Sequence, residues 1–194
     1  MKLSELMQEV TVTPDYAGIV TADDFVLAIG LAGDETGPDD YLVAQEGITE
    51  HSGTMTAQTA ESNYIRSGAQ NTKTGTTRAF NLTGDRFCGD AFQDALLAHA
   101  IKYGTGQAVI KPYVYFNMLN GKGEQGSISI VIDEDPNGAA GANAGFKATL
   151  TAKGTPKEYT YTKTVQESLQ TAAAKSTAQK LSLIHISEPT RPEP

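Results

Sequence analysis

The sequence predicts a mainly β domain, a β-sandwich or an open β-barrel that carries one flanking α-helix. Two observations support this fold class. Apolar and polar residues alternate with the period of a strand over 78–87, 108–119, 127–133 and 146–152. By contrast, only the segment that follows Asp90 combines helical periodicity with a helix start and a helix stop.

The N-terminal half is expected to supply the less regular strands. Residues 1–24 are interpreted as an N-terminal arm with a short helix over 3–10. The almost wholly apolar run FVLAIGLA (25–32), bounded by acids and glycine, is typical of a buried strand. Residues 41–68 are predicted to form one or two long, polar, threonine-rich strands. Residues 69–77 lack core-forming side chains and are predicted to be a loop.

The predicted helix begins after Asp90, which is a good N-cap residue. Gln93 stands at the third helical position and completes an aspartate version of the capping box. Gly104 ends the helix after about fourteen residues, an ordinary length in globular domains. One face carries the residues that we expect to pack the helix on the sheet, namely Phe92, Leu96, Ala100 and Tyr103.

The C-terminal half is predicted to be a four-strand meander. Strands 108–119 and 127–133 form a hairpin around Asn120-Gly121, a pair suited to left-handed turn positions. Strands 146–152 and 157–162 are expected to form a second hairpin.

Net charge and cysteine content exclude several classes of function. The chain carries a net charge of −8, which argues against a general DNA-binding protein because phosphate affinity comes from lysine and arginine. A like-charged protein can nevertheless enclose DNA without adhering to it. The one cysteine, Cys88, excludes a disulfide framework and a cysteine-rich metal site. The sequence shows no signal peptide and no apolar run of membrane-spanning length, so we expect a protein made in a cytoplasm and no membrane partner.

No catalytic, cofactor or metal site is predicted, and an enzyme is not expected. The spacing of Asp133, Asp135, Asn137 and Gly138 matches the first half of a calcium-binding loop. Ala144, however, stands where that loop requires a bidentate glutamate, and a turn-rich hairpin loop explains the same residues. Glycine-rich and acidic loops elsewhere lack the partner residues that phosphate binding or glycoside hydrolysis requires.

The C-terminal end differs in character from the rest. Residues 164–180 are interpreted as a low-complexity linker or a truncated C-terminal extension. From Leu181 to Arg191 the sequence resembles the in-frame translation of a transposase sequencing adapter, so 181–194 is interpreted as a non-native tail. Because this tail holds two glutamates and one arginine, a net charge of −7 remains for the rest of the chain.

Four motifs carry a resemblance to a known family. They are the strand end FNLTGDR (80–86), the helix start GDAFQD from Gly89, the hairpin YVYFNMLNGKGEQG (113–126) and the late strand GTPKEYTY from Gly154. The resemblance covers about residues 40–162, and this region resembles the major tail tube proteins of long-tailed bacteriophages and prophages.

The resemblance implies a structural subunit without a cofactor. Proteins of this family assemble as hexameric rings that stack into a hollow tube, through which DNA passes without specific binding. Implied partners are other copies of the chain, a tape measure protein and a tail terminator. The implied location is the virion tail, assembled in the cytoplasm of the bacterial host. The tube domain would then occupy 25–163, and some family members add an immunoglobulin-like domain after it.

The long polar strands are the expected assembly residues, because one chain's core does not account for them and a neighbouring subunit could complete their edges. The inter-subunit sheet is assigned to Tyr41, Val43, Tyr64, Phe80 and Leu82. The loop 67–77 is assigned to ring stacking together with the N-terminal arm, with the residues Gln70, Lys73 and Thr76. Two alternatives stay open: the tube of a contractile tail or phage-like bacteriocin, and a monomeric ligand-binding β-sandwich.

Overall fold

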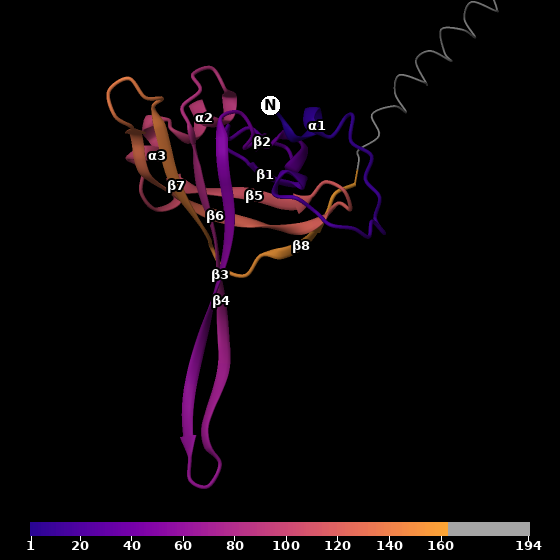
Figure 1. Cartoon of the computed structure of the whole chain (residues 1–194), viewed down its shortest axis with the longest axis vertical. Helices are drawn as coiled ribbons and strands as arrows, with labels where there is room; N and C mark the ends of the chain where they lie inside the picture. Colours follow the sequence, from indigo (N-terminus) through magenta and orange to yellow (C-terminus); the bar gives the residue numbers. More distant parts are fainter. Residues whose placement is uncertain (163–194) are drawn as a thin grey trace, which may run out of the picture. The chain divides into compact units, whose positions relative to one another are not determined.

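An antiparallel sheet of eight strands organises residues 1–162, the part of the chain described by the computed structural model (Figure 1). The linker 164–180 and the tail 181–194 lie outside the described residues. Along the sheet the strand order is β2-β1-β5-β6-β7-β4-β3, and β8 pairs with β6 off this path. The strands are β1 (Phe25–Ile29), β2 (Leu42–Val43), β3 (Ile48–Tyr64), β4 (Gly68–Asp85), β5 (Ile110–Asn117), β6 (Lys122–Asn137), β7 (Gly145–Ala152) and β8 (Lys157–Thr160). The predicted mainly β fold is confirmed.

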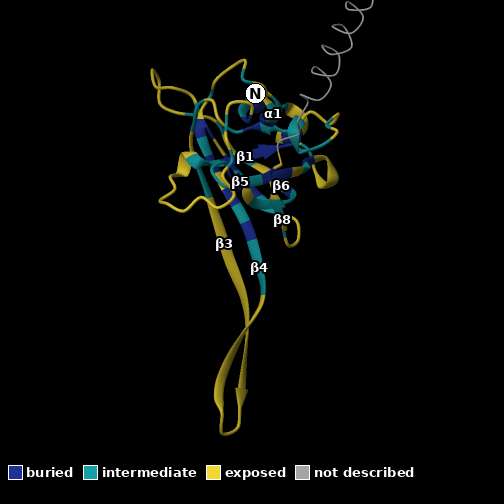
Figure 2. Ribbon diagram, turned by 90° about the vertical axis from the view of Figure 1, so that its right-hand side faces the viewer, coloured by how far each residue is buried: buried dark blue, intermediate teal, exposed yellow. Residues whose placement is uncertain are grey.

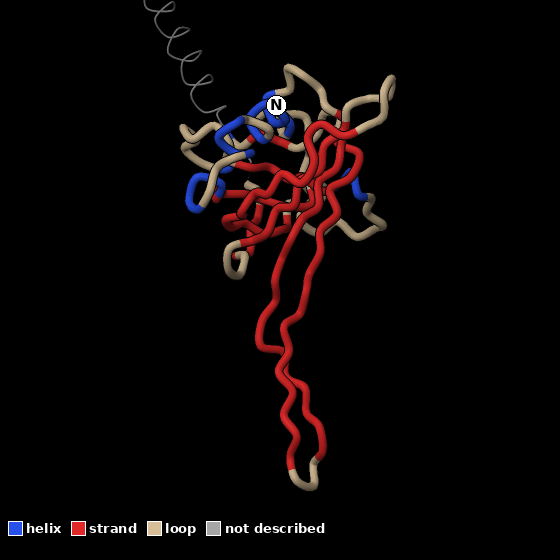
Figure 3. The backbone as a smooth tube through the Cα atoms, turned by 90° about the vertical axis from the view of Figure 1, so that its left-hand side faces the viewer, coloured by secondary structure: helices blue, strands red, loops and turns tan. Residues whose placement is uncertain are grey.

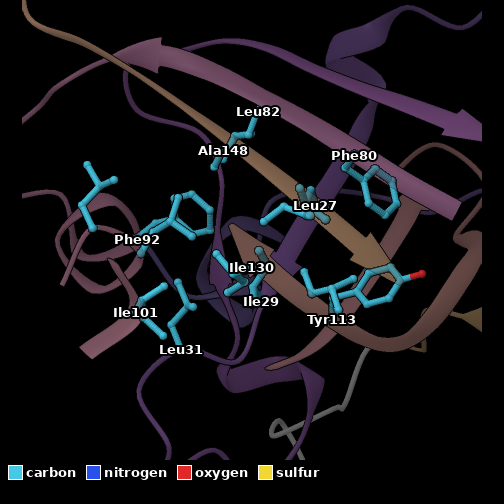
Figure 4. Packing of buried hydrophobic residues seen from close by; sticks show 14 of the residues in the cluster. Leu27, Ile29, Leu31, Phe80, Leu82, Phe92, Ile101, Tyr113, Ile130 and Ala148 are labelled. Carbon is cyan, nitrogen blue, oxygen red and sulfur yellow. The ribbon is translucent and has the colours of Figure 1, made fainter. Parts of the chain in front are cut away.

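The main core lies on one face of this sheet, under helix α2 (Ala91–Leu96). In the order β5-β6-β7-β4, a flat sheet would place β4 about 14 Å from β5, at about 4.8 Å per step. The ring of Phe80 on β4 nevertheless lies 5.5 Å from that of Tyr113 and 4.9 Å from that of Tyr115, both on β5. The sheet therefore curls over its own inner face (Figures 3 and 4). The apolar residues that alternate over 78–87, 127–133 and 146–152 point into this core, among them Leu82, Ile128, Ile130, Phe146, Ala148 and Leu150.

A second apolar cluster covers the opposite face of β1, β2 and β5. Helix α1 (Leu3–Leu6) contributes Leu3 and the following residue Met7, both fully buried. After β8, Tyr161 stacks on Phe116 of β5 with ring centroids 5.5 Å apart. The first residues of the chain thus pack on the sheet, and the N-terminal helix expected over 3–10 is shorter and spans only Leu3–Leu6.

The single predicted helix is divided into α2 and α3 (His99–Lys102). Its N-cap is confirmed, because Asp90 Oδ2 accepts a hydrogen bond from the Gln93 N–H at 2.9 Å. The helix breaks at Ala98, whose backbone is extended. The break rotates the chain so that Ile101 enters the core, and Ala100 and Tyr103 become exposed. Phe92 and Leu96 pack as expected, but the packing role predicted for Ala100 and Tyr103 is wrong.

Two strand predictions also need correction. Residues 69–77 are part of β4 and pair with β3, so this segment is a strand, where a loop was expected. The segment has no apolar period because neither of its faces covers a core. In addition, β8 pairs with the start of β6 between Lys122 and Gln125, so it does not form a hairpin with β7. No helix among the described residues is long and apolar enough to cross a membrane.

Candidate assembly surface

Strands β3 and β4 extend far beyond the other strands as a two-stranded hairpin (Figures 1 and 3). The two strands pair from Ile48 opposite Gly84 to Tyr64 opposite Gly68. Strand β7 supports β4 only between Ala79 and Asp85. We call the unsupported part, residues 54–77, the distal hairpin. No third strand joins it within residues 1–162.

The distal hairpin has no core of its own. All residues from 54 to 74 are exposed, and 75–77 are half-buried (Figure 2). Seven of its residues are threonine, and its large apolar side chains Met55, Tyr64 and Ile65 are 67%, 55% and 95% exposed. An isolated two-stranded hairpin is at best marginally stable in water. The described part of the chain therefore supplies no packing for the distal hairpin.

A tight turn closes the hairpin at residues 65–67. Arg66 and Gly68 adopt left-handed backbone conformations, with φ of 80° and 72°. Glycine enters this region freely, but arginine is found there uncommonly. The turn presents Ile65 and Arg66 at the tip, where an apolar and a cationic side chain stand side by side.

A buried charge network fixes the point at which the hairpin leaves the sheet. Arg78, 9% exposed, donates through Nε to Glu124 Oε1 on β6 at 2.6 Å. Its guanidinium lies 4.3 Å from the centre of the Phe80 ring, within the range of a cation–π contact. The guanidinium lies over Gly53, which pairs with Phe80 across the two strands, and a Cβ atom at Gly53 would lie 2.6 Å from Arg78 Nη1. Because glycine has no Cβ atom, position 53 leaves room for the Arg78 guanidinium to lie across β3.

Tyr113 on β5 completes this network. Its hydroxyl donates to Glu124 Oε1 at 3.3 Å. Burial, and then the charge of Glu124, raise the pKa of Tyr113 well above its ordinary range, so the phenol stays protonated and remains a donor. The network ties β4 to β5 and β6 just before β4 parts from β7, and so sets the direction of the distal hairpin.

The outer edge of β3 is open along its whole length of 17 residues, because no described strand pairs with that side. Natural edge strands are usually short or carry proline or lysine, which discourage pairing with another chain. Strand β3 has neither residue and only two glutamates. At the other border of the sheet, β2 spans only two residues. The β3 edge thus has the chemistry of a strand that accepts another strand.

The residues predicted for an inter-subunit sheet are divided by the structure. Phe80 and Leu82 are buried, and β4 is paired there on both sides, with β3 and with β7. They cannot offer a free edge, which lies one strand further out, on β3. Val43 is also buried, Tyr41 is half-buried, and Tyr64 is exposed near the tip.

The residues predicted for ring stacking all lie on the β4 strand of the distal hairpin. Gln70 and Lys73 are exposed and Thr76 is half-buried, opposite Ser62, Thr59 and Ala57 of β3. Sequence reasoning missed Arg78, Glu124 and Ile65. An arginine within a half-apolar strand and an isoleucine in a turn were the available signals.

The described residues give little support to other chemistry. Within residues 1–162, no group of three or more histidine, cysteine, aspartate or glutamate side chains is placed to hold a metal ion. Asp135 of the calcium-like spacing forms an ion pair with Lys102. Cys88 is exposed.

Solved structures share this fold. A chain from the tail of an empty GTA particle with C6 symmetry matches with a TM-score of 0.50 and 14% identity, over 74% of this chain and 100% of that one. A chain of the virion of a native gene transfer agent (GTA) particle matches with a TM-score of 0.50 and 14% identity, over 72% and 98%. A chain of the extended PVC sheath-tube complex, an extracellular contractile injection system, matches with a TM-score of 0.46 and 13% identity, over 83% and 99%.

The sequence matches no family model. It also matches no curated protein. At 14% identity the first two structures establish a shared fold alone.

Proposed function

We propose that this protein is a structural subunit of a phage tail tube and has no enzymatic role. Copies of it form rings, and the rings stack into a hollow conduit through which DNA passes. The observation that carries this proposal is the open β3 edge, together with a distal hairpin that packs against no other part of residues 1–162. In a monomer, both features leave surfaces without a partner, which favours unwanted association. In an assembly, the same surfaces can contact a neighbouring copy.

The shared fold supports a ring of six. One of the matched structures is a particle tail with C6 symmetry. In a ring, the β3 edge of each copy would meet a different surface of the next copy. Such a head-to-tail contact closes when the rotation between copies divides a full turn. We infer a closed hexamer in which β3 is the strand that each subunit presents to its neighbour.

The charge distribution suits a conduit. The distal hairpin holds Glu61, Arg66 and Lys73 and so carries +1, which leaves −9 for the rest of the chain. An acidic inner wall repels the phosphate backbone, and DNA can therefore move along it without being held. The tube would be part of a virion tail, assembled in the cytoplasm of a bacterial host, with a tape measure protein and a tail terminator as further partners.

Electron microscopy of the purified protein tests the proposal. Negatively stained samples across a concentration series are expected to show rings or tubes, and mass photometry should show species at multiples of the 20.5 kDa chain. A monomer that persists at high concentration would contradict it and would favour the monomeric β-sandwich alternative.

A further inference from the structure

A half-open cavity of about 280 Å³ lies beside the foot of β3. Most of its wall is apolar, from α1, β1, β2, the start of β3, the end of β5 and the residues next to them, namely Leu6, Phe25, Val26, Val43, Ala44, Ile48 and Met118. Asp23, Gln45 and His51 complete the lining. The Asp23 side chain is exposed and makes no hydrogen bond or ion pair with residues 1–162. The cavity thus combines an apolar wall with a carboxylate that has no partner in the described part of the chain.

The tip of the distal hairpin has the complementary chemistry. Ile65 is 95% exposed in a turn, a place where polar residues and glycine are usual. Tyr64 precedes it and is 55% exposed. The Arg66 guanidinium follows it and makes no ion pair within the described residues. A branched apolar side chain next to an aromatic residue and an arginine is a typical anchor of a protein interface.

We propose that the tip of the distal hairpin, residues 64–66, docks into this cavity on a second copy of the chain. Ile65 enters the apolar cavity, Tyr64 covers its mouth, and Arg66 pairs with Asp23. The +1 charge of the hairpin and the −9 charge of the rest of the chain favour the approach. The inference rests on the proposed function, because the docking joins one ring to the next.

Geometry makes this contact propagate. The cavity lies at the foot of β3 and the tip at its far end, so a chain cannot fill its own cavity. From Thr54 to Tyr64 the hairpin reaches about 35 Å, at about 3.3 Å per residue. Each docked tip leaves a free tip one hairpin length further along. The contact therefore joins two different surfaces, and copies that dock in the same orientation repeat it without limit, as an open-ended stack requires.

Cysteine cross-linking tests the docking directly. In a Cys88→Ser background, Ile65→Cys is combined with Leu6→Cys, and the full chain is oxidised under assembly conditions. A disulfide between positions 65 and 6 is expected, and it can form only between copies. The control combines Ile65→Cys with Tyr103→Cys, at a position that is 73% exposed and does not line the cavity. Peptide mass spectrometry identifies the linked positions.

Charge reversal gives a second, independent test. Arg66→Glu or Asp23→Arg alone should raise the concentration at which tubes form by about two- to fivefold, as loss of an exposed ion pair does. The double variant should restore the wild-type threshold. Ile65→Asp should raise the threshold by at least tenfold, because it places a charge against the apolar wall. All these sites are exposed or lie at the tip, so the melting temperature of the monomer should not move.

The outcomes separate the docking from the proposed function. Tubes that form without a link between positions 65 and 6 would leave the tube proposal standing and overturn the docking. Equal linkage to position 103, or a double charge reversal that restores nothing, would overturn it as well. If no tubes form and no link appears in concentrated protein, both proposals fail.

Discussion

The sheet body and the distal hairpin are built from the same two strands but follow different rules. In the body, β4 alternates buried Phe80 and Leu82 with exposed or half-buried neighbours. Beyond Thr77 toward the tip, the alternation ends and every side chain reaches solvent or is only half-buried. The strands are equally continuous in both parts. The body is explained by its own core, whereas the hairpin finds no packing surface among the described residues, and we propose that another copy supplies one.

The Arg78 network marks the boundary between the two regions. On one side of it β4 has two neighbouring strands, and on the other side only β3. A partly buried ion pair at this place constrains the direction of the hairpin more than it stabilises the fold, because its desolvation offsets much of its attraction. Changes in the body should therefore affect stability, and changes in the hairpin should affect assembly.

Removal of the distal hairpin should give the largest effect. Replacing residues 56–77 by Asn-Gly joins Met55 to its cross-strand partner Arg78 through a two-residue turn that fits this register. We expect a folded monomer with a melting temperature within a few degrees of wild type and a complete loss of tubes in electron micrographs. The matched control deletes residues 140–142 from the exposed loop between β6 and β7 and should keep assembly. If the variant without the hairpin still forms tubes, the hairpin is not required for assembly, and this account of the two regions is contradicted.

Two substitutions that shorten a side chain, one in the sheet body and one in the distal hairpin, compare the contributions of the two regions to the free energy of unfolding. Phe80→Ala removes a fully buried ring and should lower the free energy of unfolding by about 3–5 kcal/mol. Met55→Ala, on the paired strand but 67% exposed, should change it by less than about 0.5 kcal/mol. Urea titrations of the monomer measure both values. Similar losses for the two would show that the hairpin packs against its own body.

The boundary network should give an intermediate effect. Glu124→Gln leaves the Arg78 guanidinium partly buried beside a neutral acceptor, and we expect a loss of about 1–3 kcal/mol in urea titration. Adding Arg78→Met should recover part of that loss, since it removes the uncompensated charge. If the double variant is less stable than Glu124→Gln, the two residues do not act as a pair.

The smallest expected effect is a change in stability at acid pH, from the exposed ion pair between Lys2 and Asp40 in the sheet body. The hydrogen bond from Lys2 Nζ to Asp40 Oδ1, at 2.9 Å, is the main reason that the pKa of Asp40 is lowered from 3.8 to about 2. A depressed pKa gives stability that is present above pH 3.8 and is lost as pH falls toward 2. Asp40→Asn should lack this part of the pH dependence between pH 4 and pH 2 in urea midpoints. A profile identical to wild type would contradict the assignment.

The sequence predicted the body better than the hairpin for a physical reason. Strands β6 and β7 face a core on one side, and their apolar periods show it, whereas β1 is buried on both faces and is apolar throughout. Residues 69–77 face no core in their own chain, so their strand pairing leaves no apolar period and they were predicted to be a loop. The helix break at Ala98 was missed because Ala100 and Ile101 are both apolar, and only the packed sheet selects between them. For the assembly surface, the polar composition of the long strands indicated the right region. Which strand has a free edge depends on the strand order of the sheet, and that order is a tertiary property.

Hydrogen exchange in the distal hairpin tests most directly the claim that a second copy completes it. Peptides from residues 54–77 are compared in dilute monomer and in concentrated, assembled protein, with peptides of β6 and β7 as the internal reference. The account predicts rapid exchange in the monomer and a slowing of about a hundredfold or more on assembly, while the reference peptides are protected in both samples. A hairpin that is already protected in the monomer, or still exchanges freely in the assembled protein, would contradict it.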